Sequence, residues 1–316
     1  MRACIDIGGT KVAVSLAPDA VAAPGTGAPP LLRARRTEPT AKTGDPFALA
    51  RQVLRLVDEA CAEAGVAPGA ITAAGVSSCG PFVLNAGQIE LAAPNICGGL
   101  AGPARGLPND WHSAPLEAPL HQRFASLRIE NDCIAALEAE RRWGALQGLD
   151  HCAYVTWSTG IGVGLCVDGR VLRGKHGNAG HAGHMFVSDD DSHALCGCGN
   201  VGDVEGLVAG NAFERRFGQG AAALLDAAAA GDATALARVD ALCRVLGRML
   251  YNLVATLDLQ RISLGGSVFW HHRALLLARL QAQIDGRLPA LTAGAQLVPA
   301  GLGLGVGDYA ALALLS

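Results

Sequence analysis

The sequence predicts an α/β protein built from about two domains. The chain has 316 residues, and single domains typically span about 100–200 residues. A β-prone run, a glycine turn and a second β-prone run occur over residues 3–16, and the same order recurs over residues 153–169. Segments with helical spacing of apolar residues separate and follow these two patterns. We therefore expect a duplicated α/β core with helices packed on its sheets.

Composition narrows the class of protein further. Apolar residues make up 50% of the chain and aromatic residues only 4%, so the core is expected to be sizeable and mostly aliphatic. The net charge of −3 opposes a broad nucleic-acid surface, because such a surface must neutralise phosphates. The start of the chain lacks the pattern of a signal peptide, and no uncharged apolar run reaches the roughly 20 residues of a membrane span. The cysteines lie mostly in apolar runs, so a reduced, cytoplasmic compartment without disulfides is expected.

The expected elements follow from periodicity and turn residues. β-Prone runs predict strands at 3–7, 12–16, 71–77, 128–130, 153–157, 164–169 and 261–266. Helical spacing predicts helices at 47–65, 132–144, 206–217, 221–230, 235–257 and 271–287, and at the end of the chain. Segments 18–30 and 92–112 are rich in Pro and Gly, which break helices and strands, and are expected to be loops.

The first glycine turn carries the motif Asp6-x-Gly8-Gly9-Thr10-Lys11. Paired glycines let backbone N–H groups approach an anion closely, and threonine adds a hydroxyl. Asp6 ends the preceding strand and is suited to hold a hydrated Mg²⁺ ion. The motif differs from a Walker A loop, which needs a longer glycine-to-lysine spacing. The turn is a candidate phosphate site, and a plain hairpin turn is the alternative.

A second glycine turn has the same character. It runs from Ser158 through Thr159, Gly160 and Gly162, again between two β-prone runs and again with hydroxyl donors. Together the two turns favour a nucleotide phosphate, although each could be structural only. A third glycine group, Gly265-Gly266, ends a short strand. It would permit close approach of a flat ligand such as adenine, or simply form a sharp strand-to-helix turn.

An acidic motif, Glu130-Asn131-Asp132, lies where a strand passes into a helix. An aspartate at a helix start is commonly an N-terminal cap. The same position could instead place a carboxylate so that it accepts the proton of an attacking hydroxyl, with the neighbouring amide binding other hydroxyls.

A possible metal site lies between residues 177 and 205. This segment contains His181, His184, Cys196, Cys198 and Asp203, followed by Glu205. Clustered histidine and cysteine are typical of tetrahedral zinc sites, and the Cys-x-Cys-Gly turn could bring two sulfurs to one ion. The alternative is that these residues meet by chance, with Asp203 as a helix cap.

The motifs together resemble the ROK family of sugar kinases in the actin/hexokinase-like ATPase superfamily. DIGGTK, END, STGIGVG, GHAGHM, CGCGNVGDVE and GGS occur in the family's order and approximate spacing. The resemblance covers nearly the whole chain. It implies a two-domain actin-like ATPase fold, of the ribonuclease H-like type, with an interdomain cleft. The implied domains are 1–120, a small α/β domain completed by a C-terminal helix at 304–316, and 121–303, a large α/β domain with the metal motif and a helical bundle.

The resemblance also implies an activity and its residues. ATP and Mg²⁺ would bind at the two glycine turns and the Gly265-Gly266 pair, and the γ-phosphoryl group would pass to a sugar hydroxyl, expected at O6. Asp132 matches the catalytic base. Asn131, His184 and Glu205 match sugar-binding positions, and Gly80 and Asn95 fall near others. His184, Cys196 and Cys198 match zinc ligands, and a homodimer is implied.

Two positions depart from the family pattern. Asp203 stands where the family has its third zinc cysteine, so a Cys₂HisAsp site is expected to be harder and weaker, with His193 as another possible ligand. His181 replaces the glutamate of the glucokinase-type E-x-G-H motif, a change that resembles bacterial N-acetylmannosamine kinases. Neutral imidazole can accept one hydrogen bond and donate one, which suits an acetamido group or a different hydroxyl stereochemistry.

The sequence therefore predicts an ATP-dependent kinase of a hexose or N-acetylhexosamine, with N-acetylmannosamine or glucose favoured. One alternative is a sugar-responsive ROK-type regulator, which would need a DNA-binding head. Because DIGGTK begins at residue 6, we expect no such head. The other alternative is a catalytically silent sugar-binding scaffold, which the departure at Asp203 keeps open.

Overall fold

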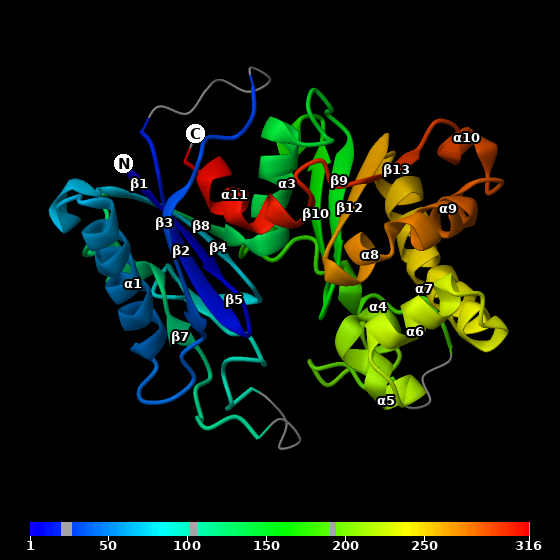
Figure 1. Cartoon of the computed structure of the whole chain (residues 1–316), viewed down its shortest axis with the longest axis horizontal. Helices are drawn as coiled ribbons and strands as arrows, with labels where there is room; N and C mark the ends of the chain where they lie inside the picture. Colours follow the sequence, from blue (N-terminus) through cyan, green and yellow to red (C-terminus); the bar gives the residue numbers. More distant parts are fainter. Residues whose placement is uncertain (20–26, 101–105, 190–193, 316) are drawn as a thin grey trace. The chain divides into compact units, whose positions relative to one another are not determined.

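The computed structural model describes residues 1–19, 27–100, 106–189 and 194–315. The chain forms two compact units (Figure 1). Unit 1 comprises Met1–Trp143, Arg173–Ala179 and Gly305–Ser316, and unit 2 comprises Gly144–Leu172 and Gly180–Leu304. The division differs from the predicted boundary at residues 120 and 121. The reason is that the elements between that boundary and Trp143 pair and pack with the first sheet.

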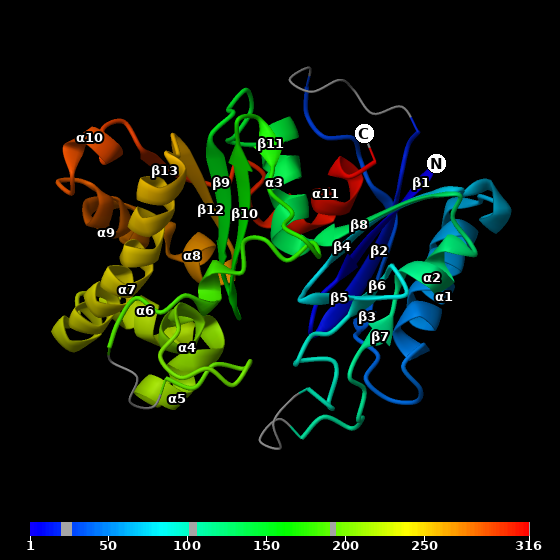
Figure 2. The same cartoon turned by 180° about the vertical axis from the view of Figure 1, so that it is seen from behind.

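Unit 1 is built on a five-stranded mixed sheet in the order β3-β2-β1-β4-β8 (Figure 2). Its strands are β1 (Arg2–Ile7), β2 (Lys11–Ala17), β3 (Arg33–Pro39), β4 (Ala73–Ser78) and β8 (Ser126–Asn131). β1 and β2 form the predicted antiparallel hairpin, while β1, β4 and β8 run parallel. The predicted strands at 71–77 and 128–130 are thus confirmed, with shifted ends.

Helices cover both faces of this sheet. Ile5 and Val76 share a core with α1 (Ala48–Ala64). Neighbouring residues on a strand point to opposite faces, and a Cβ on Gly75 would lie 2.0 Å from the carbonyl oxygen of Ala311 in α11 (Val306–Ala313). The expected C-terminal helix therefore packs on the face opposite α1, together with α3 (Asp132–Trp143).

Short elements of unit 1 were not predicted. A small sheet joins β5 (Phe82–Asn85), β6 (Gln88–Leu91) and β7 (Ala114–Pro115), with helix α2 (Glu117–His121) beside β6. The single turn η1 (Pro68–Ala70) follows α1. β3 was missed as well, because it is an edge strand of mostly polar residues with no apolar alternation. The described part of segment 92–112 contains no helix or strand, as expected. Most of the expected loop at 18–30 lies outside the described residues.

Unit 2 repeats the central arrangement of unit 1. Its sheet has the order β11-β10-β9-β12-β13, in which β9 (Cys152–Trp157) is antiparallel to β10 (Ile161–Val167) and parallel to β12 (Arg261–Gly265). β1 stands in the same relation to β2 and β4. The predicted duplication of the core is therefore confirmed. The edge strands are β11 (Arg170–Val171) and β13 (Gln296–Pro299).

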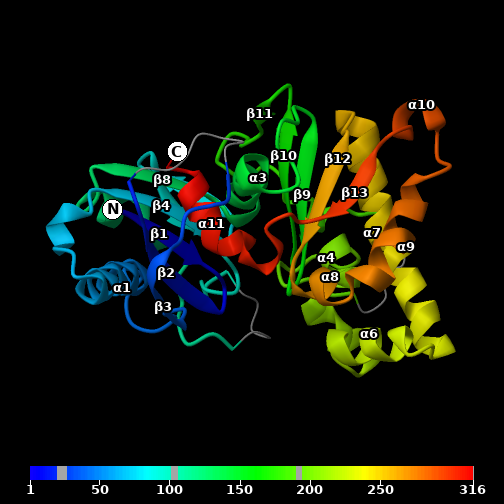
Figure 3. The ribbon, with the colours of Figure 1, turned by 45° about the horizontal axis from the view of Figure 1, so that its top comes forward.

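Helices of unit 2 lie against this sheet (Figure 3). Between them is one continuous, mostly aliphatic core. The long helix α7 (Ala233–Leu257) packs beside α9 (Arg273–Ile284) and α6 (Ala221–Ala229). Shorter elements are η3 (Ala182–His184), α8 (Ser267–His271), α10 (Pro289–Thr292) and η5 (Gly303–Gly305). Among the described residues, no helix is both long and apolar enough to cross a membrane.

Two predicted elements of unit 2 need correction. The expected helix 206–217 is divided into α4 (Val204–Val208), η4 (Gly210–Ala212) and α5 (Phe213–Phe217). It breaks where the N–H of Gly210 donates to the carbonyl of Ser158 at 2.7 Å. The glycine run 158–164 is also shorter as a turn than expected, because β10 already begins at Ile161. Gly162 therefore lies within a strand.

Candidate functional site

The parallel strands of unit 1 bring three polar side chains to one edge of the sheet. Ile7 of β1, Ser78 of β4 and Asn131 of β8 lie in register. Asp6, Cys79 and Asp132 consequently occupy neighbouring strand ends. Ligands bind characteristically at the carboxyl ends of strands in open α/β sheets. The predicted Mg²⁺ residue and the predicted base, which are far apart in sequence, belong to one site.

Burial raises the pKa of both carboxyl groups, and for Asp6 the charge of Asp132 adds to the effect. Burial contributes most to raising the pKa of Asp6 to about 7, and the nearby charge of Asp132 adds to it. Lys11 and a 3.4 Å hydrogen bond from Ser77 Oγ oppose this shift. Burial likewise raises the pKa of Asp132. A carboxylate of raised basicity is a better proton acceptor, and a carboxylate pair attracts a divalent cation.

Asp132 has a fixed local geometry at the first residue of α3. The N–H of Cys133 donates to Asp132 Oδ1 at 2.8 Å and to Asn131 Oδ1 at 3.0 Å. The contact of Asn131, the residue before the helix, is the capping contact expected of a helix start. Asp132 Oδ1 is held by a backbone N–H, and side-chain hydrogen bonds with Cys133 and Asn131 also contact this carboxyl group, so its position is fixed.

The first glycine turn is closed by several contacts. The N–H of Gly8 donates to the carbonyl of Lys11 at 2.9 Å, and Thr40 Oγ1 donates to the carbonyl of Gly8 at 2.7 Å. A Cβ on Gly9 would lie 2.0 Å from Nδ2 of Asn95. Asn95, which falls near a sugar-binding position of the family, therefore contacts the turn itself. Thr10 and Lys11 are exposed.

Gly80 lies just beyond the end of β4, before Pro81 and β5. It is therefore adjacent in the chain to Cys79 and to the same strand edge. Unit 1 thus contains Asp6, the first glycine turn, Gly80, Asn95, Asn131 and Asp132.

The second glycine turn is held by the segment after α4. The carbonyls of Ser158 and Thr159 accept hydrogen bonds from the N–H groups of Gly210 and Asn211, at 2.7 and 3.2 Å. Glu205 Oε2 accepts from the N–H of Ile161 at 3.0 Å, and a Cβ on Gly160 would lie 2.7 Å from that oxygen. Glu205, predicted to bind sugar, is therefore also a support of this turn.

The Gly265-Gly266 pair is explained by packing on β9. A Cβ on Gly265 would lie 2.3 Å from the hydroxyl of Tyr154. Gly266 has a φ of +88°, and a Cβ there would lie 2.4 Å from the carbonyl of Trp157. These contacts support the interpretation that the glycine pair forms a sharp strand-to-helix turn. The other interpretation was close approach of a flat ligand.

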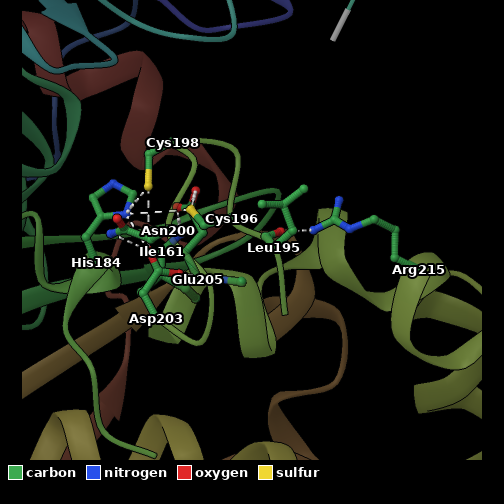
Figure 4. A network of polar contacts seen from close by, with 10 residues as sticks. Ile161, His184, Leu195, Cys196, Cys198, Asn200, Asp203, Glu205 and Arg215 are labelled. Atoms are coloured by element: carbon green, nitrogen blue, oxygen red, sulfur yellow. Dashed lines mark hydrogen bonds and ion pairs between the residues drawn. The ribbon is translucent and has the colours of Figure 1, made fainter. Parts of the chain in front are cut away.

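The predicted metal ligands of unit 2 form one cluster (Figure 4). One ligand atom from each of His184, Cys196, Cys198 and Asp203 lies within 4.8 Å of all the others. His184 Nδ1 lies 3.0 Å from Asp203 Oδ2, 3.7 Å from Cys196 Sγ and 3.6 Å from Cys198 Sγ. Cys198 Sγ lies 3.7 Å from Asp203 Oδ2.

The three distances that involve a sulfur fit a tetrahedral zinc ion, whereas the 3.0 Å between His184 Nδ1 and Asp203 Oδ2 is a hydrogen-bond distance that a bound ion would lengthen. Zinc bonds of about 2.0–2.3 Å separate neighbouring ligand atoms of a tetrahedron by about 3.3–3.8 Å. The donor set of two thiols, an imidazole and a carboxylate suits zinc. The substituted residue Asp203 is wholly buried, and its Oδ1 also accepts from the N–H of Gly206 at 2.7 Å as the N-terminal cap of α4. The cap therefore uses Oδ1, while Oδ2 lies in the ligand cluster, so the two interpretations of Asp203 do not exclude one another.

The hydrogen bond between His184 and Asp203 shifts the pKa values of both groups toward their charged forms. Burial alone would raise the pKa of Asp203, but hydrogen bonds, that of His184 foremost, lower it below its ordinary value. The same bond raises the pKa of His184. All three contacts of His184 to the cluster use Nδ1, so Nε2 lies outside it. His193, the other possible ligand, lies outside the described residues.

His181 stacks on His184, with ring centroids 6.0 Å apart and an angle of 19° between the planes. Its Nε2 is buried and has no hydrogen-bond partner within the described ranges. Burial, followed by the neighbouring His184, lowers the pKa of His181. The ring is therefore neutral near pH 7 and has one unsatisfied nitrogen. A ligand polar group could satisfy that nitrogen.

Several supporting residues were not predicted. Cys79 lies between the two aspartates, Ser77 donates to Asp6, and Asn200 donates to Asp203 Oδ2 at 3.2 Å. Alignment of parallel strand ends could have indicated the first two. Nothing in the local sequence indicates the third.

The fold and site define a class before any comparison. A duplicated core with glycine turns and an acidic strand edge is that of the actin-like ATPases. The ROK family model matches residues 2–315. A glucokinase from Aeropyrum pernix is 29% identical over 71% of this chain and 73% of its own length.

Two further relatives agree with this match. An N-acetylmannosamine kinase from Escherichia coli O9:H4 (strain HS) is 33% identical over 84% of this chain and 82% of its own length. The crystal structure of a ROK hexokinase from Thermus thermophilus superposes with a TM-score of 0.74 at 30% identity, covering 99% of this chain and 97% of that one. The chain belongs to the ROK family and is a sugar kinase.

Proposed function

We propose that the protein transfers the γ-phosphoryl group of ATP to O6 of a hexose or N-acetylhexosamine. The observation that carries this proposal is the fixed, basic carboxylate of Asp132 beside Asp6 at the strand edge. The Asp132 carboxylate accepts the proton of the sugar hydroxyl as the hydroxyl oxygen bonds to the γ-phosphorus. The bond from that phosphorus to the β–γ bridging oxygen breaks, and ADP leaves.

The glycine turns hold the phosphates in this proposal. Gly8, Gly9 and Thr10 would contact phosphate oxygens from unit 1, and Ser158, Thr159 and Gly160 from unit 2. Close backbone approach favours this role, since turn amides stabilise anions without a side chain. Asp6 would hold Mg²⁺, whose charge offsets the charge developing on the transferred group.

Zinc has a structural role in the proposal. His184, Cys196, Cys198 and Asp203 would hold the ion, which would fix the loop that precedes α4. His184 would bind through Nδ1 and so present Nε2 to the sugar. Glu205 Oε1 lies 3.5 Å from Cys196 Sγ, so the same loop orients a second sugar-binding group.

His181 is proposed to select the sugar. Its unsatisfied Nε2 favours a ligand with a matching polar group, because leaving a buried nitrogen unpaired costs about 1–3 kcal/mol. An acetamido group supplies both an acceptor and a donor. We therefore rank N-acetylmannosamine first and glucose second. The homodimer and the cytoplasmic location stay predictions from the family resemblance and composition.

Coupled measurement of ADP release tests the proposal. Wild type is assayed with glucose, N-acetylglucosamine and N-acetylmannosamine. Asp132→Asn should lower kcat by at least about 100-fold while sugar binding, measured by calorimetry, is nearly retained. A near-native rate for Asp132→Asn would refute the base. A wild type that binds sugar without releasing ADP would favour the scaffold or regulator instead. His181→Glu should shift preference toward glucose, and unchanged preference would refute the role of His181.

A further inference from the structure

The loop Arg173–Ala179, called the strap below, is part of unit 1 although the residues on both sides of it belong to unit 2. Leu172 and Gly180, which flank it, both hydrogen-bond to the backbone of β10. The N–H of Ala179 donates to the carbonyl of Arg173 at 3.0 Å, so the ends of the strap meet. The strap is therefore a loop whose two ends are hydrogen-bonded to each other and whose flanking residues pair with β10. Its own contacts are with unit 1.

One of these contacts joins the two elements that meet at Asp132. Arg173 Nε donates to Glu130 Oε1, and Nη2 of the same guanidinium donates to Glu138 Oε1 at 3.2 Å. Glu130 is the penultimate residue of β8, just before Asn131, and Glu138 lies on α3, which begins at Asp132. Glu130 is only 7% exposed. A charged hydrogen bond to a buried carboxylate is stronger than a surface ion pair.

A second contact holds the other end of the strap. Asn178 Oδ1 accepts from the N–H of Phe82, and Asn178 Nδ2 donates to the carbonyl of Phe82, both at 2.8 Å. Phe82 begins β5, next to the segment that contains Gly80. The strap is thus seated on unit 1 without the help of Arg173. Replacing Arg173 should remove its bridge and leave the loop in place.

We propose that Arg173 is a positioning residue for phosphoryl transfer. By bridging Glu130 and Glu138 it fixes the junction of β8 and α3, and with it the direction of the Asp132 carboxylate. This inference rests on the proposed role of Asp132 as the base. Proton transfer is sensitive to misplacement of a fraction of an ångström, whereas sugar binding is shared among several groups. Loss of the bridge should therefore lower kcat more than sugar affinity.

Steady-state kinetics of Arg173→Gln and Arg173→Lys test the inference. Both should lose between about 10-fold and 100-fold in kcat, with sugar KM and the melting temperature little changed. Lysine keeps the positive charge but cannot reproduce the two-point contact of the guanidinium. Arg128→Gln is the matched control. Arg128 contacts the same Glu130 oxygen at 3.4 Å but lies on β8 itself, so its loss should leave kcat near wild type.

Glu138→Gln should reproduce the loss in kcat. The double variant Glu138→Gln/Arg173→Gln should lose no more than Arg173→Gln alone, because both changes remove one bridge. Wild-type kcat in Arg173→Gln, or full recovery in Arg173→Lys, would overturn the inference while the kinase activity stands. A fall that appears equally in Arg128→Gln would overturn it as well, by assigning the effect to the charge around Glu130. A wild type that phosphorylates no sugar would overturn both proposals.

Discussion

The two oxygens of Asp203 make separate contacts, so substitutions there can separate the observed helix cap from the proposed zinc ligand. Oδ1 accepts from the Gly206 N–H at 2.7 Å and caps α4. Oδ2 lies 3.0 Å from His184 Nδ1 and 3.7 Å from Cys198 Sγ, in the metal cluster. The change Asp203→Asn keeps a capping oxygen and removes the anionic ligand. The change Asp203→Cys supplies a thiolate ligand and removes the cap, and Asp203→Ala removes both functions.

The cap and the proposed ligand predict different rankings of the variants, one for stability without metal and one for zinc affinity. Without metal, loss of the cap should cost about 1 kcal/mol, so Asp203→Cys and Asp203→Ala should be less stable than wild type and Asp203→Asn. Zinc affinity should instead be highest for Asp203→Cys, lower for wild type, and lowest for Asp203→Asn and Asp203→Ala, because thiolate is the softer ligand. Zinc at 100 times its Kd should stabilise a binding variant by about 2.7 kcal/mol.

The measurements are chemical unfolding with and without zinc, and metal content by mass spectrometry. A change of 1 kcal/mol moves the melting temperature by about 2–4 °C for domains of 150–250 residues, so both effects are measurable. The matched control is Asp232, which caps α7 through Ala235 N–H at 2.7 Å. Asp232→Ala should lose the cap and keep the zinc response. Native zinc stoichiometry in Asp203→Asn, with native stabilisation, would refute the ligand assignment.

Three further outcomes follow from the geometry. Because the pKa of Asp6 is raised from 3.8 to about 7 in the folded protein, the folded state binds more protons, and stability should fall as pH rises from about 4 to 7, by at most about 4 kcal/mol. Urea unfolding in Mg²⁺-free buffer should show Asp6→Asn gaining on wild type over that range, and a constant difference would contradict it. Gly75→Ala should destabilise the protein by about 1–3 kcal/mol or more, because the added Cβ would lie 2.0 Å from the Ala311 carbonyl oxygen. Gly69→Ala is the control, since its Cβ would meet no atom within 4 Å. Equal melting temperatures for the two variants would contradict the clash. Gly160→Ala should displace Glu205 and raise the KM for ATP and sugar together, whereas an effect on neither would separate Glu205 from the turn.

Local pattern was sufficient for many elements of this protein. Apolar spacing placed α1 and α7, because a helix buries one face whatever it packs against. It failed over 206–217, where a contact between Gly210 and the distant Ser158 interrupts the helix. It also missed β3, because the sequence of this strand is mostly polar and the strand is formed by backbone hydrogen bonds to β2.

The motifs by themselves determined which chemical groups the site contains: the glycine turns, Asp132, and the histidine and cysteine ligands. Only tertiary structure decided how these groups are arranged and which charges they carry. Strand register put Asp6 beside Asp132, and burial at that edge raised both pKa values. Folding of the loop before α4 divided the Asp203 carboxylate between a cap and the metal cluster. The physical reason is that residue type and spacing are local properties, whereas burial, charge proximity and ligand geometry arise between residues distant in the chain.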